Sequence, residues 1–133
     1  MGLSGALAYN KISATSGVED ADPHMLIQML IDGAIEKINK AKYFMNEKKI
    51  AQKGQHISWA ISIINGLQAS LDFEKGGDIS NNLNDLYEFC TTTLMHANAE
   101  NSIEKLDDVL KVMGNIREAW VGIRDQALAM NNS

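Results

Sequence analysis

Four segments of this 133-residue chain repeat apolar residues at the spacing of one helix face, and this pattern restricts the fold more than any other feature. The segments begin near residues 22, 50, 79 and 101, with short connections between them. The only proline, Pro23, stands at the start of the first segment, which leaves the rest free to be helical. Short connections favour antiparallel neighbours. We therefore predict an all-α protein, an antiparallel up-down-up-down four-helix bundle over residues 22–130.

Charge and composition exclude several classes of partner. The net charge is −5, and Lys and Arg are not clustered, which argues against binding to nucleic acid or to an anionic membrane. The single cysteine cannot form an internal disulfide, so nothing indicates an oxidising compartment. We see neither a basic and apolar leader nor an apolar stretch of about 18 residues. We expect a soluble cytoplasmic protein.

The break between the second and third segments is a pair of glycines, Gly76 and Gly77. A glycine adopts the left-handed conformation that ends a helix without strain. Asp78 follows and can cap the free amides of the next helix. The apolar repeat of that helix consists of Ile79, Leu83, Leu86 and Cys90. We interpret the two glycines as a structural hinge that reverses the chain, with at least one at positive φ.

Two other helices have recognisable starts. Asp22 followed by Pro23 is an N-cap with proline in the first turn, where a missing amide hydrogen does no harm. Asn101, with Glu104 three residues later, fits a capping box at the start of the fourth helix. Both signals support the boundaries drawn from the apolar repeats.

The two ends of the chain lack the helical pattern. Residues 1–21 are rich in Gly, Ser and Ala, which is typical of a frayed terminus. Yet Tyr9 and Ile12 are three residues apart and would share one apolar edge in a helical turn. We expect an N-terminal arm that either packs back on the bundle or frays, and a disordered tail at residues 131–133.

The first helix has a wider apolar face than one neighbouring helix needs, because a second stripe runs beside the first. Such a face is more often core than binding site, but an apolar surface at a groove also marks partner sites. Asp32 interrupts it, either as a solvated acid or as an acceptor for backbone amides of something that lies across the face. The candidate partner-binding residues are Tyr9, Ile12, Met29, Leu30, Asp32, Trp59 and Ile63.

No constellation of catalytic or metal-binding residues emerges. None of the glutamates has a histidine three positions later, which excludes the di-iron motif of helical bundles. The histidines His24, His56 and His96 have no cation three residues on, although a histidine phosphotransfer bundle in signalling stays the alternative function. Cys90 is expected to be a buried, inert thiol. We predict no enzymatic activity, no metal and no cofactor.

The order and spacing of several blocks resemble the FliS family, the cytosolic export chaperones for flagellin. The resemblance covers most of the chain, from Tyr9 to Trp120. Its blocks are Tyr9-Asn10; Pro23, Leu26, Met29-Leu30 and Asp32-Gly33-Ala34; Leu71-Asp72, Glu74, Gly76-Gly77, Ile79, Asn82-Leu83, Leu86-Tyr87, Leu94 and Ala97-Asn98; and Leu106-Asp107, Ile116-Arg117 and Ala119-Trp120.

The resemblance implies an antiparallel helical bundle that binds the C-terminal segment of flagellin, which is disordered before export, and prevents its premature polymerisation. It also implies that the N-terminal arm covers an apolar pocket when the client is absent. Other flagellar export or regulatory proteins are possible partners. The chain departs from the family pattern at Asp22, where Ser or Thr is usual, and at Ile31 and Phe89, where Tyr is common.

Overall fold

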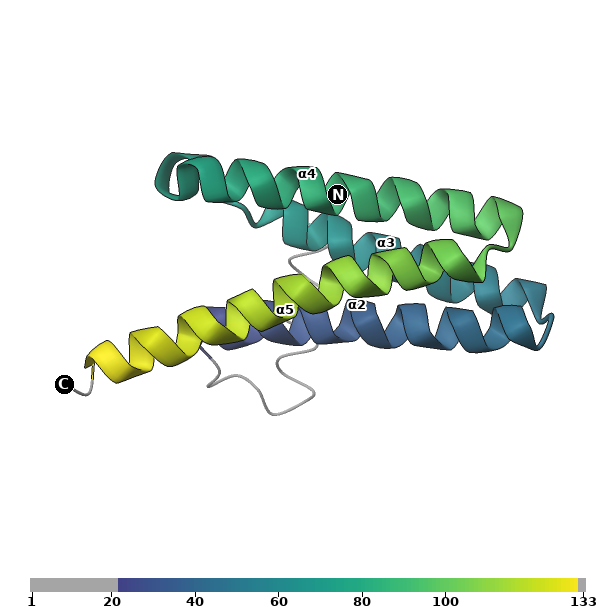
Figure 1. The fold of residues 1–133 in the computed structure, drawn as a ribbon, viewed down its shortest axis with the longest axis horizontal. Helices are drawn as coiled ribbons and strands as arrows, with labels where there is room; N and C mark the ends of the chain where they lie inside the picture. The colour runs from purple at the N-terminus through teal and green to yellow at the C-terminus, as the bar shows by residue number, and fades with distance from the viewer. Residues whose placement is uncertain (1–21, 132–133) are drawn as a thin grey trace.

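The computed structural model describes the backbone of residues 22–131 and the side chains of residues 22–123. This part of the chain forms four helices and no strands. The helices are α2 (Pro23–Asn46), α3 (Ile50–Ala69), α4 (Phe73–Glu100) and α5 (Ile103–Asn131). Figure 1 shows the chain running one way along the bundle in α2 and α4 and back again in α3 and α5. The prediction of an all-α four-helix bundle is confirmed.

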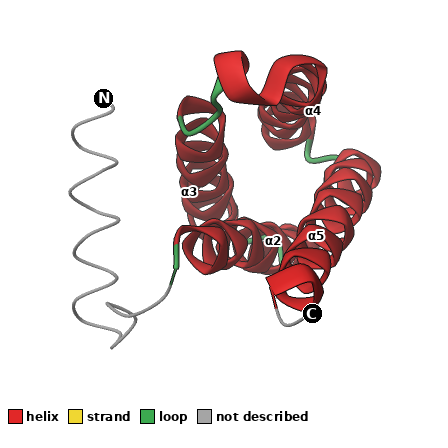
Figure 2. Ribbon diagram, turned by 90° about the vertical axis from the view of Figure 1, so that its left-hand side faces the viewer, coloured by secondary structure: helices red, strands yellow, loops and turns green. Residues whose placement is uncertain are grey.

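Each helix packs against two others, α2 and α4 each lying against both α3 and α5, so that the four form the square seen in Figure 2. Two ion pairs fix the relative direction of α2 and α5. Lys42 Nζ lies 2.7 Å from Asp107 Oδ1. Ten residues earlier in α2, Asp32 accepts a hydrogen bond from Arg117, ten residues later in α5. The two helices therefore run in opposite directions.

The core consists of aliphatic side chains from all four helices. Alanine occupies buried positions on three of them, which lets the helix backbones approach closely. The largest fully buried residues are Ile31, Ile38, Ile57, Ile64, Leu67, Cys90, Leu94, Leu106, Val109 and Met113, and the fully buried alanines are Ala34, Ala41, Ala60 and Ala97. The main apolar stripe that the sequence predicts for the first helix is buried except at its first residue, which is partly buried; its members are Ile27, Ile31, Ala34, Ile38, Ala41 and Met45.

The α2 helix starts as predicted, whereas α5 does not. The Asp22 carboxylate accepts from the Met25 amide at 2.8 Å, and Pro23 is the first helical residue. At the start of α5 the cap is Ser102, whose hydroxyl oxygen accepts from the Lys105 amide at 3.1 Å. Asn101, the predicted cap, instead ends α4 in the left-handed conformation. The other end of α5 includes Asn131, the first residue of the expected tail.

The reversal from α3 into the main part of α4 begins at residues 70–72 and ends at Gly77, which has the positive φ expected for one of the two glycines. Asp72, rather than Asp78, caps the helix by accepting from the amides of residues 74 and 75, at 3.1 and 3.0 Å. Gly77 has φ 50° and ψ −123° and separates the first turn of α4 from the rest. The pair therefore forms a kink inside a helix.

The Ser80 side chain holds this kink in place. Its hydroxyl donates to the Asp72 carbonyl at 2.9 Å, and Ser80 is buried. A Cβ atom on Gly76 would overlap that hydroxyl, whereas Gly77 has open space around it. Gly76 is thus required by packing and Gly77 by its backbone conformation.

Two residues of the predicted α4 core stripe point outward. Ile79 is 66% exposed and Leu86 is 38% exposed, although the sequence placed both on the core face. The buried line of α4 passes instead through Ser80, Tyr87 and Leu94, which are seven residues apart. Because Ser80 is tied to the Asp72 carbonyl, its neighbour Ile79 is turned to one side.

Replacing Gly77 by Ala is expected to lower the free energy of unfolding by about 1 kcal/mol or more, because a side chain is strained at this φ. Gly76→Ala should also destabilise the fold, because the new methyl group would overlap the Ser80 hydroxyl. The control is Gly114→Ala, inside α5 with nothing near the new methyl group. The free energy of unfolding of that variant should be higher than that of the wild type by roughly 0.5–1 kcal/mol. Urea denaturation followed by circular dichroism measures all three, and an unchanged Gly77→Ala midpoint would contradict the assignment.

Candidate partner-binding surface

The surface that α2 and α3 share carries three of the predicted site residues. The δ1 carbon of Ile63 lies 3.7 Å from the position that a Cβ atom on Gly33 would occupy. One turn further along α2, the Lys37 ammonium lies over the Trp59 ring, 3.7 Å from its centre. Met29 lies one turn before Gly33 and therefore on the same face of α2. We call the set Met29, Gly33, Lys37, Trp59 and Ile63 the α2–α3 surface.

Aromatic rings extend this surface towards the C-terminal end of α2. The Phe44 and His56 rings lie with centroids 5.1 Å apart, and His56 is 6.2 Å from the Trp59 ring. The His56 Nδ1 atom donates to the Gln52 carbonyl at 2.8 Å, since a carbonyl oxygen can only accept. Tyr43 packs edge-on against Phe44 and is itself more than half exposed. Four rings thus line one edge of the bundle.

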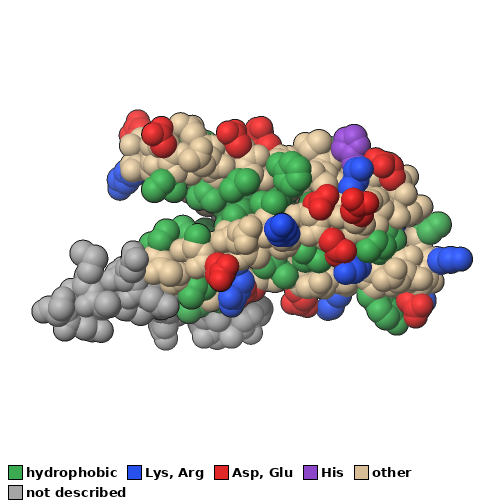
Figure 3. All heavy atoms as spheres, in the orientation of Figure 1, with side chains coloured by type: hydrophobic (Ala, Val, Ile, Leu, Met, Phe, Trp, Pro, Cys, Tyr) green, Lys and Arg blue, Asp and Glu red, His purple; other side chains and the backbone are tan. Residues whose placement is uncertain are grey.

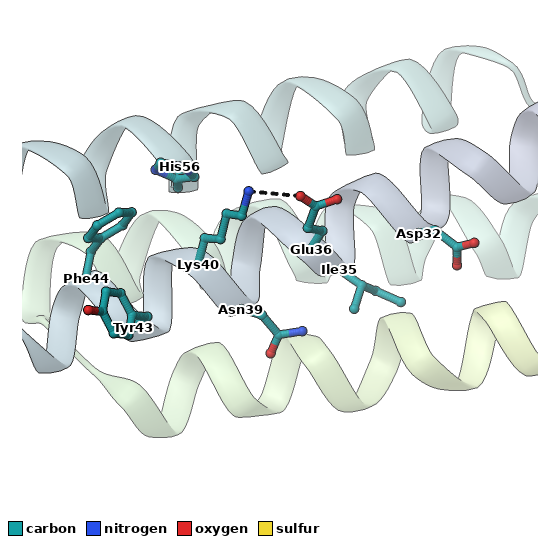
Figure 4. Close-up of a pocket in the computed structure, with 8 residues that line it drawn as sticks. All are labelled: Asp32, Ile35, Glu36, Asn39, Lys40, Tyr43, Phe44 and His56. Carbon is teal, nitrogen blue, oxygen red and sulfur yellow. Dashed lines mark ion pairs between the residues drawn. The ribbon is translucent and has the colours of Figure 1, made fainter. Parts of the chain in front are cut away.

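An open hollow of about 700 Å³ lies beside these rings, along the outer face of α2 (Figure 4). In Figure 4, Tyr43 and Phe44 stand at one end, with His56 contributed by α3. The residues that line it are Asp32, Ile35, Glu36, Asn39, Lys40, Tyr43, Phe44 and His56. Of these eight, the sequence had indicated only Asp32 as a candidate binding residue. Six of the other seven lie on α2 at a spacing of three and four residues, and this spacing is the signal that could have found them.

The charges beside the hollow are already paired within the protein. Lys40 lies 3.0 Å from the Glu36 carboxylate, and Lys37 lies 3.9 Å from it. The hydrogen bond from Lys40, together with the positive charges of Lys37 and Lys40, lowers the pKa of the Glu36 carboxyl. Because the charges compensate one another, the uncompensated feature of this face is its apolar and aromatic area.

Asp32 and Leu30 are set apart from the other predicted residues. Asp32 accepts from Arg117 of α5 and so belongs to the α2–α5 side, in neither of the roles considered from the sequence. Leu30 is half buried and packs against the core. Trp59, by contrast, is 50% exposed. Tyr9 and Ile12 lie outside the described residues.

The surroundings of two histidines argue against phosphotransfer. The His24 ring stacks on Trp120 with centroids 4.2 Å apart, and the Trp120 indole nitrogen donates to the His24 carbonyl at 2.9 Å. His96 Nδ1 lies 3.5 Å from the Glu100 carboxylate, whose charge would repel a phosphoryl group. Within residues 22–123, no three His, Cys, Asp or Glu side chains are grouped to hold a metal ion.

None of the described helices combines the length and the apolar character that crossing a membrane requires.

A family model described as "Flagellar protein FliS" matches residues 5–127. The chain belongs to the FliS family. It is similar to the flagellar secretion chaperone FliS of Salmonella typhimurium, with 42% identity over 125 residues that cover 93% of each chain. The corresponding FliS of Vibrio cholerae is 40% identical over 113 residues, covering 85% of this chain and 83% of that protein. The flagellar secretion chaperone FliSB of Pseudomonas aeruginosa is 39% identical over 115 residues, covering 86% and 91%.

Membership of this family confirms two predictions. The resemblance seen in the sequence is correct, and it extends over nearly the whole chain. Because the FliS relatives are chaperones, the protein is a flagellar export chaperone and not an enzyme. The alternative of a phosphotransfer bundle is thereby set aside.

Proposed function

We propose that this chaperone binds the C-terminal segment of flagellin in the cytoplasm and prevents its premature polymerisation. The observation that carries the proposal is the apolar α2–α3 surface, with Trp59 half exposed, in a member of a family of flagellar secretion chaperones. Gly33 has no side chain to cover Ile63, so a client helix can approach closely there. Trp59 beside it offers a large flat contact area.

The physical basis of such a chaperone is the burial of apolar surface. A disordered client that folds onto the chaperone hides the apolar face with which it would otherwise self-associate. Part of the binding free energy is lost in ordering the client, which leaves the complex reversible. The charges on this face compensate one another, so the apolar and aromatic contacts are expected to dominate the affinity. No nucleotide or metal is needed for this mechanism.

Full-length flagellin is expected to bind in isothermal titration calorimetry, whereas flagellin without its C-terminal helical region is expected not to bind. The physical reason is that the region carrying the apolar face has been removed. The control is circular dichroism of the truncated flagellin, which should polymerise poorly but still be folded. Equal affinity for both forms would refute the proposal.

Trp59→Ala is expected to weaken flagellin binding by about tenfold or more, because exposed tryptophans at interfaces often contribute the most binding energy. The matched control is Ile50→Ala, which removes an exposed apolar side chain from the start of the same helix. Both variants should melt close to the wild type. If the two changes weaken binding equally, the α2–α3 surface is not the client site.

We also propose that the N-terminal arm, residues 1–21, takes part in client binding through Tyr9 and Ile12. Deleting residues 1–15 is then expected to weaken flagellin binding in the same titration. An arm that only shields the surface would compete with the client, and its deletion would tighten binding by the shared coupling free energy. Hydrogen exchange of residues 5–15 that is fast and independent of the client would exclude both roles.

A further inference from the structure

A second apolar surface lies on the opposite side of the square from the α2–α3 surface, between α4 and α5. Figure 3 shows a cleft between these helices at the end where α4 begins, with hydrophobic side chains on both walls. Ile79, Leu86 and Phe89 of α4 and Ile123 of α5 are exposed here, Phe89 by 46% and Ile123 by 50%. We call these four residues the α4–α5 groove.

The spacing of the α4 residues places them on one flank of the helix. Leu86 follows Ile79 by seven residues, and Phe89 follows Leu86 by three. All three side chains therefore face a similar direction. Asn84, two residues before Leu86 and hence on the other side of α4, accepts a hydrogen bond from Gln68 of α3 at 2.7 Å. The apolar flank therefore faces away from α3.

On α5 one line of residues passes from the core to the surface. Val109, Ile116 and Ile123 are seven residues apart and share this line; the first two are buried, and the third is half exposed. Figure 1 shows α5 running away from α4 towards its C-terminal end. The divergence explains why the same line is covered at one end and open at the other.

The rim of the groove on α4 is acidic. Asp78 and Asp85 directly precede Ile79 and Leu86, whereas Glu88 lies on the α3 side, where its carboxylate is 3.5 Å from the Gln68 amide nitrogen. On α5, Glu118 lies two residues after Ile116 and hence on the other side of that helix, and Arg117 is engaged with Asp32 on the α2 side. An apolar floor with carboxylates along its edge complements an apolar stripe flanked by cations.

We propose that the α4–α5 groove binds an amphipathic helix with Lys or Arg beside its apolar stripe, carried by a partner other than the client. Leu86 and Ile79 receive the apolar stripe, and Asp78 and Asp85 attract the flanking cations. A second copy of this chain fits less well, because pairing two such grooves would bring like charges together. Since the groove and the α2–α3 surface lie on opposite sides, partner and client can be bound together.

The probe is a fluorescein-labelled peptide of Leu and Lys, about 18 residues or five helical turns long, with all its leucines on one face. A peptide in which Glu replaces Lys has the same apolar stripe and the opposite charge. Fluorescence anisotropy with the full-length protein should show binding of the basic peptide, and binding of the acidic peptide about tenfold weaker or less. Equal binding of both peptides would overturn the charge assignment.

Substitutions separate the groove from simple charge attraction. Leu86→Asp adds a carboxylate, which would strengthen purely electrostatic binding. We expect it instead to weaken binding of the basic peptide about tenfold, because the apolar contact with Leu86 is lost. The matched control is Met95→Asp, since Met95 is also exposed to solvent, by 56% against 38% for Leu86, and lies on the other side of α4. That variant should bind as the wild type does. Thermal melting followed by circular dichroism verifies that both variants fold.

Three outcomes would overturn the proposal. Equal peptide affinities for Leu86→Asp and Met95→Asp would show that the groove is not the binding site. Self-association in sedimentation velocity that Leu86→Asp abolishes would assign the groove to a second copy. A loss of flagellin affinity in Leu86→Asp would assign it to the client. Because wild-type binding of flagellin is measured separately, failure of this proposal leaves the proposed client site untouched.

Discussion

The buried ammonium of Lys53 fixes the end of the bundle at which α4 passes into α5. Lys53 is only 4% exposed, and its Nζ donates to the Asn98 carbonyl at 3.0 Å and to the Asn101 side chain at 2.6 Å. A buried charge is unfavourable unless such acceptors surround it. The contact therefore holds the last turn of α4 against α3 and keeps Asn101 in the left-handed conformation that ends the helix.

The opposite end of α4 is held by different contacts. Asp72 caps the helix, Ser80 ties its second turn to the Asp72 carbonyl, and Gly77 supplies the conformation that joins the two. Among the side chains of residues 22–123, no similar contact draws α5 towards α4 at this end. A helix pair that is fastened at one end and apart at the other leaves apolar side chains uncovered between them, which is the origin of the α4–α5 groove.

Local signals in the sequence were sufficient to predict the number of helices and the N-cap of the first one. Asp22 and Pro23 act within one turn, so their meaning does not depend on the rest of the fold. The start of α4 was predicted too late because Asp72 and Asp78 are equally good caps, and glycine can mark a kink as well as a reversal. Lys53 was missed because only the neighbouring helix supplies its acceptors.

The candidate site was predictable to a similar degree. Trp59 and Ile63 are four residues apart, and Met29 shares a face with Gly33, so helix geometry alone brings them to the same side. The contacts of Phe44 with His56 and of Asp32 with Arg117 depend on how far one helix is shifted along another. A single sequence does not specify that shift, because each apolar stripe can slide by a turn and still be buried.

Cys90 gives the bundle a chemical reporter of its own opening. The thiol is fully buried in the α4 contribution to the core, and burial raises its pKa to about 12. Since the thiolate is the reactive form, a reagent in neutral solution can modify this position only while α4 is separated from its neighbours. The rate of that modification therefore measures how often the chaperone opens, with no label added to the native chain.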